Sequence, residues 1–210
     1  MKDLVIMMEH YYTSKSATEK VIQNIEYHVK GTKLTFLTSN AVFSKSQIDF
    51  GSRHLIEWFL ESHEDISGGL LDIGCGYGPI GITLAKFFPD IQITMADINE
   101  RALELSEENV KINKIKNKVE ILKSDGFEKI TGKFNFVLTN PPIRAGKDIV
   151  FSIYEGASKH LTPGGSLYSV IQKKQGAPSS IKKMESIFGN CTIKSKKAGY
   201  YILQAIKAEQ

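Results

Sequence analysis

Residues 70–87 read LLDIGCGYGPIGITLAKF, and this stretch decides the fold. A short apolar run ends near an aspartate, glycines follow at alternate positions, and a helical pattern begins at Pro79. Glycines let a backbone turn tightly, and proline is favoured in the first turn of a helix. The stretch therefore predicts a buried strand, a glycine-rich turn and a helix, which together form the first unit of a parallel sheet covered by helices.

The same alternation of short apolar runs and helical stretches continues along the chain. The predicted strands are residues 70–73, 91–96, 119–122, 134–139 and 166–171, then 191–195 and 200–206 as an antiparallel pair. Asn99 is suited to cap one of the helices, and residues 162–165, TPGG, predict a turn before the fifth strand. We therefore expect an α/β fold with a doubly wound, mostly parallel, seven-stranded Rossmann-like sheet.

A small β-hairpin is predicted ahead of this sheet. Residues 26–38 alternate apolar and polar side chains around a turn at Gly31 and Thr32. A helix with apolar residues three and four positions apart follows from about Ser52. We expect residues 1–47 to form an N-terminal extension and residues 48–210 to form the main domain.

Composition excludes several classes of protein. The chain has 210 residues, of which 41% are hydrophobic and 24% are charged, enough for one substantial core. It has no apolar run long enough to span a membrane and no cleavable leader, so we expect a cytoplasmic protein. Cys75 and Cys191 are the only cysteines, and the five histidines are scattered, so we expect no metal site.

The positive charge is concentrated at the C-terminal end. The net charge is +4, and residues 169–210 contain eight Lys or Arg against two Asp or Glu. A local basic surface suits a polyanion such as RNA, although lysines on a solvated face give the same composition. The lysines concerned are Lys173, Lys174, Lys182, Lys183, Lys194, Lys196 and Lys197.

Three aspartates follow the first three predicted strands, where open parallel sheets bind their ligands. Gly76, Gly78 and Gly81 also have the spacing of dinucleotide-binding proteins, so a dehydrogenase stays open, and Asp97 suits the ribose of either cofactor class. Asp72 favours a different cofactor, because a carboxylate beside the glycines attracts an amino-acid ammonium group and repels a pyrophosphate. Asp125 is placed either to accept a hydrogen bond from an adenine amino group or to serve as a turn residue.

Residues 139–142 read TNPP at the end of the fourth strand. The Asn140 side-chain oxygen and the Pro141 carbonyl can accept both N–H bonds of an amino group, and the prolines remove competing donors. An exocyclic base amine is a poor nucleophile, so holding both N–H groups turns its lone pair toward an electrophile. The motif indicates transfer of a group to an amine, with an ordinary Asn-Pro turn as the competing interpretation.

Together these motifs resemble the class I S-adenosylmethionine-dependent methyltransferases of the small-domain ribosomal RNA type, which methylate guanine N2 in small-subunit rRNA. The resemblance runs from about Gly31 to the C-terminus. It includes VFSKSQIDFGSRHLIE at residues 42–57, DIGCGYG at 72–78 and NPPIRAGK at 140–147. EHYY at residues 9–12 looks like the leader of single-domain bacterial members.

The resemblance implies a role for each matching residue. Asp72, Gly74 and Gly76 surround the methionine part of S-adenosylmethionine, Asp97 binds the ribose and Asp125 the adenine. The full implied cofactor set is Phe43, Asp72, Gly74, Cys75, Gly76, Gly78, Asp97, Ile98, Asp125, Gly126 and Asn140, although Phe43 is equally well explained as a buried aromatic. The implied catalytic residues are Asn140, Pro141 and Pro142, and the implied substrate-binding residues are Ile143, Arg144 and Lys147.

Ile143 departs from the related enzymes that methylate adenine N6 or the glutamine of release factors, because those present an aromatic ring there. The longer rRNA enzymes also have an additional N-terminal domain, which we do not expect here. The resulting prediction is methylation of a guanine N2 in 16S rRNA by a monomer, with rRNA or the small ribosomal subunit as partner and without a membrane or a metal. A protein glutamine-N5 methyltransferase and a non-catalytic ribosome assembly factor that binds S-adenosylmethionine or RNA remain as alternatives.

Overall fold

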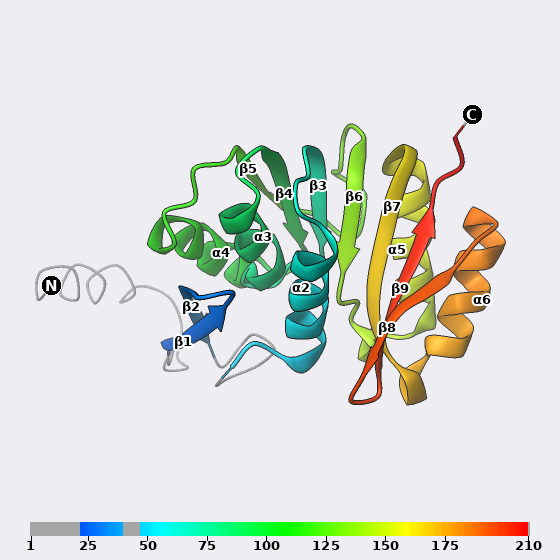
Figure 1. The fold of residues 1–210 in the computed structure, drawn as a ribbon, viewed down its shortest axis with the longest axis horizontal. Coiled ribbons are helices and arrows are strands. Elements are labelled where there is room, and N and C mark those ends of the chain that lie inside the picture. Colours follow the sequence, from blue (N-terminus) through cyan, green and yellow to red (C-terminus); the bar gives the residue numbers. More distant parts are fainter. Residues whose placement is uncertain (1–21, 40–46, 210) are drawn as a thin grey trace, which may run out of the picture.

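A seven-stranded sheet with the strand order β5-β4-β3-β6-β7-β9-β8 forms the centre of the protein (Figure 1). This computed structural model describes residues 22–39 and 47–209, and the predicted cofactor contact of Phe43 lies outside them. The first five strands of this sheet along the chain are parallel, whereas β9 runs antiparallel to both of its neighbours, β7 and β8. The strands are β3 (Gly68–Ile73), β4 (Ile91–Asp97), β5 (Val119–Lys123), β6 (Phe134–Thr139), β7 (Leu161–Gln172), β8 (Thr192–Lys197) and β9 (Tyr200–Ile206).

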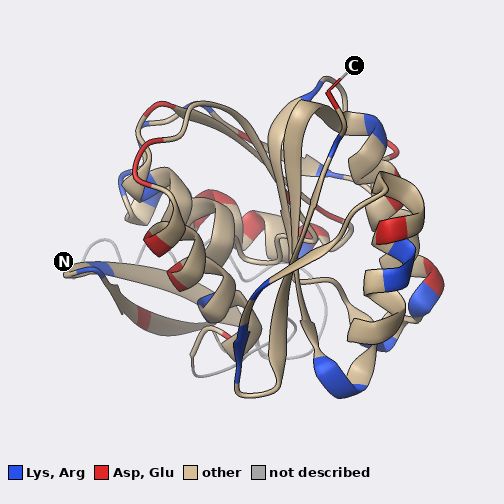
Figure 2. Ribbon diagram, turned by 45° about the vertical axis from the view of Figure 1, so that its right-hand side comes forward, with Lys and Arg blue, Asp and Glu red and all other residues tan. Residues whose placement is uncertain are grey.

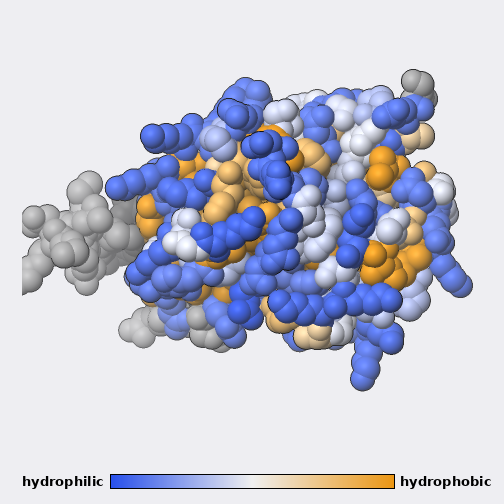
Figure 3. Space-filling view, in the orientation of Figure 1, coloured by the Kyte–Doolittle hydropathy of each residue, from blue (hydrophilic) through white to orange (hydrophobic). Residues whose placement is uncertain are grey.

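Helices cover both faces of the sheet, so the predicted doubly wound fold is confirmed. One face packs against α2 (Phe50–Ser62), α3 (Pro79–Phe87) and α4 (Glu100–Ile112), and the other against α5 (Lys147–His160) and α6 (Ala177–Phe188). Phe59 is fully buried on the first face and Tyr154 on the second. The outer surface seen in Figure 3 is mostly hydrophilic, because these helices turn their apolar sides inward.

Two predicted turns differ from the structure. Residues 162–165 are not a turn but part of β7, where the five-residue step from Leu161 to Ser166 lies opposite the two-residue step from Phe134 to Phe136 of β6 and forms a bulge. In the hairpin the turn residues are Lys30 and Gly31, and Thr32 already begins the second strand. Both turn residues have positive φ, 43° and 74°, which matches the twist of a tight two-residue hairpin turn.

The starts of two predicted helices can be compared with the structure. Asn99 caps α4 as expected, its side chain accepting a hydrogen bond from the Arg101 N–H. The helix predicted from about Ser52 begins earlier, at Phe50, because the Asp49 carboxylate caps it by accepting from the Ser52 N–H at 3.0 Å. This cap places Asp49 next to the carboxyl ends of the central strands, as described below.

The predicted hairpin, formed by β1 (Ile22–Val29) and β2 (Thr32–Ser39), packs against α4 and contributes side chains to the core. Asn109 of α4 is completely buried and joins three segments. Its amide oxygen accepts from the Leu37 N–H at 2.6 Å, and its nitrogen donates to the carbonyls of Leu37 at 3.0 Å and Tyr77 at 2.9 Å. Asn109 therefore links the hairpin to the glycine-rich loop, while the division of the chain at residues 47 and 48 stays a prediction.

We expect the substitution Asn109→Ala to lower the free energy of unfolding by about 2–4 kcal/mol, because it leaves three buried backbone groups without partners. Thermal or urea unfolding followed by circular dichroism measures this change. Glu108→Ala is the matched control, since Glu108 is partly exposed on the same helix and its ion pair with Lys111 lies at the surface. Equal stabilities of the two variants would contradict this role for Asn109.

Within the described ranges, no helix is long and apolar enough to cross a membrane. The same ranges contain no cluster of three or more His, Cys, Asp or Glu side chains that could hold a metal ion.

Candidate active site

The predicted site residues gather at the carboxyl ends of β3, β4 and β6. The chain direction of the crossovers reverses between β3 and its neighbour β6, and ligands of open α/β sheets bind at such a switch point. In the strand register Asp72 lies opposite Leu138 on β6 and opposite Met95 on β4. Gly74 and Asn140, the first residues after β3 and β6, are therefore brought to the same edge.

Asp72 is a completely buried carboxylate with one unused oxygen. Its Oδ2 accepts a hydrogen bond from the Gly81 N–H in the first turns of α3 at 2.9 Å. Its Oδ1 is buried and has no hydrogen-bond partner among the described residues. Burial raises the pKa of Asp72 to about 7, the Gly81 N–H opposes this, and the charge of Asp97 adds to it. A buried acceptor without a donor is suited to a cationic ligand group such as an ammonium.

The glycine loop after β3 leaves open space where a ligand can approach. Gly74 and Gly76 have positive φ of 72° and 59°, and a Cβ added to either would meet nothing within 4 Å. Gly78 differs, since a Cβ there would lie 2.7 Å from the Ile82 side chain, so this glycine serves the packing at the start of α3. The Cys75 thiol is also buried in the core, and burial raises its pKa well above the usual range, so only its backbone can face a ligand.

Asp97 lies at the end of β4 and holds the loop in place. One carboxylate oxygen accepts from the Gly76 N–H at 2.8 Å and the other from the Asn99 N–H at 2.8 Å. Each oxygen keeps a further lone pair for a ribose hydroxyl. Next to it, Ile98 is an exposed apolar side chain, 60% accessible, which is suited to pack on an adenine ring. Asp125 is exposed in the loop after β5, followed by Gly126 with a φ of 50°.

Asn140 follows β6 and is held by helix α2. Its side-chain nitrogen donates to Asp49 Oδ1 at 2.9 Å and to Ser52 Oγ at 3.0 Å. In the described part of the chain both hydrogen bonds of this side chain use the nitrogen, and the Asn140 oxygen accepts none. The Thr139 hydroxyl, donating to the Ile73 carbonyl at 2.9 Å, ties the end of β6 to the end of β3.

The residues after Asn140 form a short, open loop. Pro141 is buried, and its carbonyl accepts no hydrogen bond within the described ranges, whereas the Pro142 carbonyl accepts from the Ala145 N–H at 2.9 Å. Ile143 begins the turn η1 (Ile143–Ala145) and is half-buried against the core, while Arg144 and Lys147 are exposed. The free acceptors of Asn140 and Pro141 are thus adjacent along the backbone, and charged side chains lie next to them.

The residues that sequence reasoning missed lie at the start of α2 and in the β8–β9 hairpin. Asp49 and Ser52 form hydrogen bonds with Asn140. The ring centroids of Phe50 and Tyr200 lie 5.2 Å apart. The Gln172 side chain donates to the Tyr200 hydroxyl at 2.7 Å. The DFGS motif at residues 49–52 was a visible signal, but its contacts with residues far along the chain could not be deduced from local patterns.

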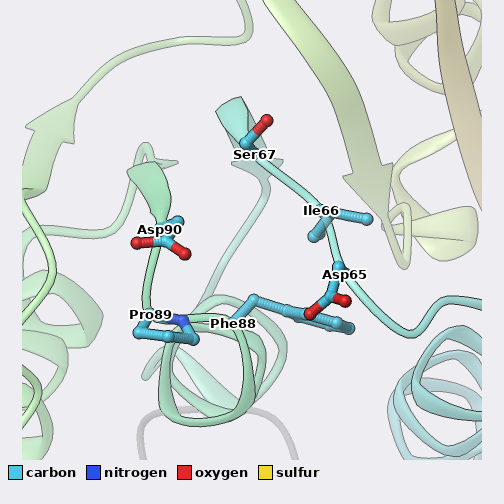
Figure 4. A pocket seen from close by; sticks show the side chains of 6 residues that line it. All are labelled: Asp65, Ile66, Ser67, Phe88, Pro89 and Asp90. Atoms are coloured by element: carbon cyan, nitrogen blue, oxygen red, sulfur yellow. The ribbon is translucent and has the colours of Figure 1, made fainter.

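A pocket lies at the opposite end of the sheet, at the amino ends of the parallel strands (Figure 4). It is lined by Asp65, Ile66, Ser67, Phe88, Pro89 and Asp90, which precede β3 and β4. None of these residues was predicted to bind a ligand, and the amino ends of parallel strands are not where such sheets place their sites.

The buried acceptor of Asp72, the open space above two glycines and the two acceptors after β6 fit a sulfonium-bearing amino-acid nucleoside and a target amine. Fold and site thus define the class of S-adenosylmethionine-dependent methyltransferases with a Rossmann-like sheet. Residues 33–204 match the family described as "Methyltransferase small domain". The chain belongs to this family.

Several relatives are similar over most of the chain. The protein YbxB of Bacillus subtilis, described as uncharacterized, is 48% identical over 203 residues, which cover 96% of this chain and all of that protein. The ribosomal RNA small subunit methyltransferase C of Aeromonas hydrophila is 41% identical over 65% of this chain. That of Vibrio cholerae is 32% identical over 85%. These matches span 39% and 51% of the two methyltransferases, so this chain corresponds to about half of such proteins or less.

A solved structure agrees with this assignment. The T. thermophilus 16S rRNA N2 G1207 methyltransferase, RsmC, in complex with AdoMet and guanosine, superposes with a TM-score of 0.81 and 25% identity. The match covers 91% of this chain and 52% of that one. The predicted family resemblance and fold are therefore confirmed, and the dehydrogenase alternative is set aside.

Proposed function

We propose that this protein transfers the methyl group of S-adenosylmethionine to the N2 amine of a guanine in small-subunit rRNA. The observation that supports this most is the geometry at Asn140, whose nitrogen is held by Asp49 and Ser52 while its oxygen is left for a donor. An amine has two N–H donors, and Asn140 Oδ1 and the Pro141 carbonyl are two adjacent acceptors. The similar T. thermophilus structure, a 16S rRNA N2 G1207 methyltransferase with bound guanosine, supports guanine N2 as the particular amine.

The cofactor supplies a methyl group made electrophilic by a positively charged sulfur. The protein's part is to position the amine: the two acceptors take both N–H groups, so that the nitrogen lone pair points along the line of transfer. Asp72 and Asp97 would hold the cofactor, which would supply its methyl group to the amine nitrogen and would be left as a neutral thioether. Positive charge develops on the nitrogen, where the two acceptor oxygens stabilise it, and the extra proton leaves to water afterwards.

Cofactor and substrate roles follow the same proposal. We assign the ammonium of the cofactor to Asp72, its ribose to Asp97 and its adenine to Ile98, Asp125 and Gly126. Ile143 would pack against the guanine, which must be unpaired or flipped out because its N2 amine is otherwise engaged in base pairing. Arg144 and Lys147 are suited to contact the flanking phosphates.

Methyl transfer to RNA from cells that lack this protein tests the proposal. With labelled cofactor and either free rRNA or small subunits, we expect N2-methylguanosine after nucleoside analysis, and none with Asn140→Ala. Label in a protein band instead of RNA would replace this function with glutamine methylation, which needs the same amine-holding geometry. No label in either, together with rescue of a deletion phenotype by Asn140→Ala, would favour a non-catalytic assembly factor.

We also propose that RNA approaches over a basic rim, defined as Lys173, Lys174, Lys196 and Lys197. All four lysines are exposed, and they either follow the carboxyl end of β7 or end β8, in a region where Figure 2 shows basic residues in blue. The first two are in η2 (Lys173–Gln175), which is joined to the β8–β9 turn by a hydrogen bond from the Lys173 N–H to the Gly199 carbonyl at 2.8 Å.

Tyr200 connects this rim to the catalytic residue. A Cβ placed on Gly51 would lie 3.2 Å from the Tyr200 ring and 3.3 Å from the Asn140 nitrogen, so ring and amide approach the same glycine. On the other side of the site, α4 bears a row of acidic side chains, which repel phosphates, although two of them, Glu100 and Glu108, are ion-paired with Lys123 and Lys111. The members of this row are Glu100, Glu104, Glu107 and Glu108. The asymmetry of charge favours entry of RNA from the rim.

Replacing all four rim lysines by glutamine is expected to raise the KM for the RNA substrate about 10- to 100-fold at near-physiological salt, with little change in kcat at saturation. The slope of log binding constant against log salt is expected to fall by about 3, since each phosphate contact on a single strand contributes about 0.7. The matched control replaces Lys116, Lys118, Lys133 and Lys159, which lie near the opposite end of the sheet. Equal effects of both fourfold variants would show that the rim lysines act only through the overall charge of the protein and not through their position.

A further inference from the structure

Asp49 makes two hydrogen bonds through a single carboxylate oxygen. Oδ1 accepts from the Ser52 N–H at 3.0 Å, which caps helix α2, and from the Asn140 side-chain nitrogen at 2.9 Å. Ser52 is buried, and its hydroxyl oxygen accepts the second N–H of the same nitrogen at 3.0 Å. Residues 91 and 88 positions apart in sequence thus use both donors of the Asn140 amide.

These contacts decide which end of the amide faces the substrate. The oxygen and nitrogen of an asparagine amide occupy nearly the same volume, so shape alone does not distinguish the two orientations. Ser52 does not distinguish them either, because a hydroxyl can accept or donate. An ionised carboxylate only accepts, so a flipped amide would place the Asn140 oxygen against the Asp49 oxygen at hydrogen-bond distance, where the two repel.

We propose that Asp49, assisted by Ser52, is a positioning residue that holds the Asn140 amide with its oxygen toward the target amine. This inference rests on the proposed amine methyltransferase function and adds residues outside the NPP motif. Asp49 touches neither substrate nor cofactor in this scheme and acts only through Asn140. Gly51, which lies between Asp49 and Ser52 in the sequence, belongs to the same arrangement. A Cβ on Gly51 would lie 3.2 Å from Asp49 Oδ1 and 3.3 Å from the Asn140 nitrogen.

The test must separate this role from helix capping. Asp49→Ser keeps a side-chain oxygen for the Ser52 N–H, because serine caps helices about as well as aspartate, but it is neutral and one atom shorter toward Asn140. Asp49→Ala removes both functions, and Asp49→Asn keeps an oxygen for both partners.

We expect Asp49→Ser to have a melting temperature within about 2 °C of the wild type and a kcat lowered about 10- to 100-fold, with an unchanged affinity for the cofactor. Asp49→Asn should recover most of the lost kcat, and Asp49→Ala should lose both stability and kcat. Ser52→Ala should lower kcat about three- to tenfold, compared with Ser62→Ala at the exposed far end of the same helix as matched control. Wild-type turnover of Asp49→Ser would overturn the proposal.

A double-mutant cycle identifies the residue through which Asp49 acts. Once Asn140 is alanine, Asp49→Ser should lower kcat no further, because the side chain that it positions is gone. An equally large second loss in the Asn140→Ala background would show that Asp49 acts by another route and would overturn the proposal.

A measurement without substrate separates this inference from the proposed function. The side-chain NH2 signal of Asn140 in a nitrogen-15 correlation spectrum, assigned by its disappearance in Asn140→Ala, should exchange slowly with water in the wild-type protein and at least tenfold faster in Asp49→Ser. This result would stand even if no guanine were methylated. Unchanged exchange in Asp49→Ser would refute the positioning role while leaving guanine methylation intact.

Discussion

Asn140→Ala is expected to lower the turnover number about 10²- to 10³-fold, because it removes one of two acceptors that orient the amine and stabilise its developing charge. The affinity for the cofactor should stay within about twofold, since in the proposed function Asn140 contacts the target amine, and its additional assignment to the cofactor site stays an untested prediction. Single-turnover methylation of substrate RNA, combined with calorimetric titration of the cofactor, measures both quantities.

Asn140→Asp is an informative companion to this variant. It keeps an oxygen facing the substrate, but it replaces the nitrogen that donates to Asp49 and Ser52 by a second oxygen. Repulsion between the two carboxylates should move the side chain and lower turnover to a similar extent. Turnover near the wild-type level in both variants would show that the NPP segment acts through its backbone alone.

Asp72→Asn is expected to weaken cofactor binding by about 100-fold or more, because it removes the charged partner of a buried ammonium group. Asparagine has the same shape and can still accept from the Gly81 N–H, so the fold should be kept. Calorimetric titration with the cofactor measures the loss, and Asp65→Asn, an exposed carboxylate with the same change of charge, is the matched control. Affinity within a few-fold of the wild type would place the ammonium elsewhere.

The raised pKa of Asp72 adds a dependence on pH with a definite sign. The folded carboxyl has a pKa of about 7, against 3.8 in the unfolded chain, so between these values the folded protein binds more protons. The free energy of unfolding of the cofactor-free protein should therefore fall as pH rises through this window, and Asp72→Asn should remove that slope. Cofactor affinity should change in the opposite direction, rising up to tenfold per pH unit between about pH 5.5 and 7, because binding needs the ionised form.

Much of the architecture could be predicted from the periodicity of apolar residues and from the residues that mark the ends of helices and strands. Apolar runs predicted where the strands lie along the chain, and Pro79 and Asn99 marked helix starts. Aspartates at the ends of successive strands indicated one ligand-binding edge. The predicted strands and helix starts are confirmed because each depends on neighbouring residues and on the fixed geometry of parallel strands, whereas ligand binding at this edge stays a prediction. Asp72 and Asn140 lie at the same edge for the same reason, because the adjacent strands β3 and β6 both end there.

The contacts of α2 could not be predicted in this way. Asp49 reads locally as a helix cap, and its second partner lies 91 positions away, so only the packing of α2 across the ends of the strands brings them together. Tyr200 belongs to the last strand, whose position depends on how β9 and β8 are added antiparallel to the sheet. The bulge in β7 was missed because a Thr-Pro-Gly-Gly segment has the composition of a turn whether or not it keeps strand pairing.

The outermost strand β8 has a consequence for folding and solubility. Among the strands that the structure describes it pairs with β9 alone, so its other side presents backbone groups that a strand of a second copy could join. The strand is six residues long, its register with β9 shifts around Lys194, and Lys194, Lys196 and Lys197 are all exposed. A foreign strand would have to desolvate these ammonium groups and match an irregular edge. The lysines of this strand therefore protect the folded protein from adding strands of its own copies to this edge.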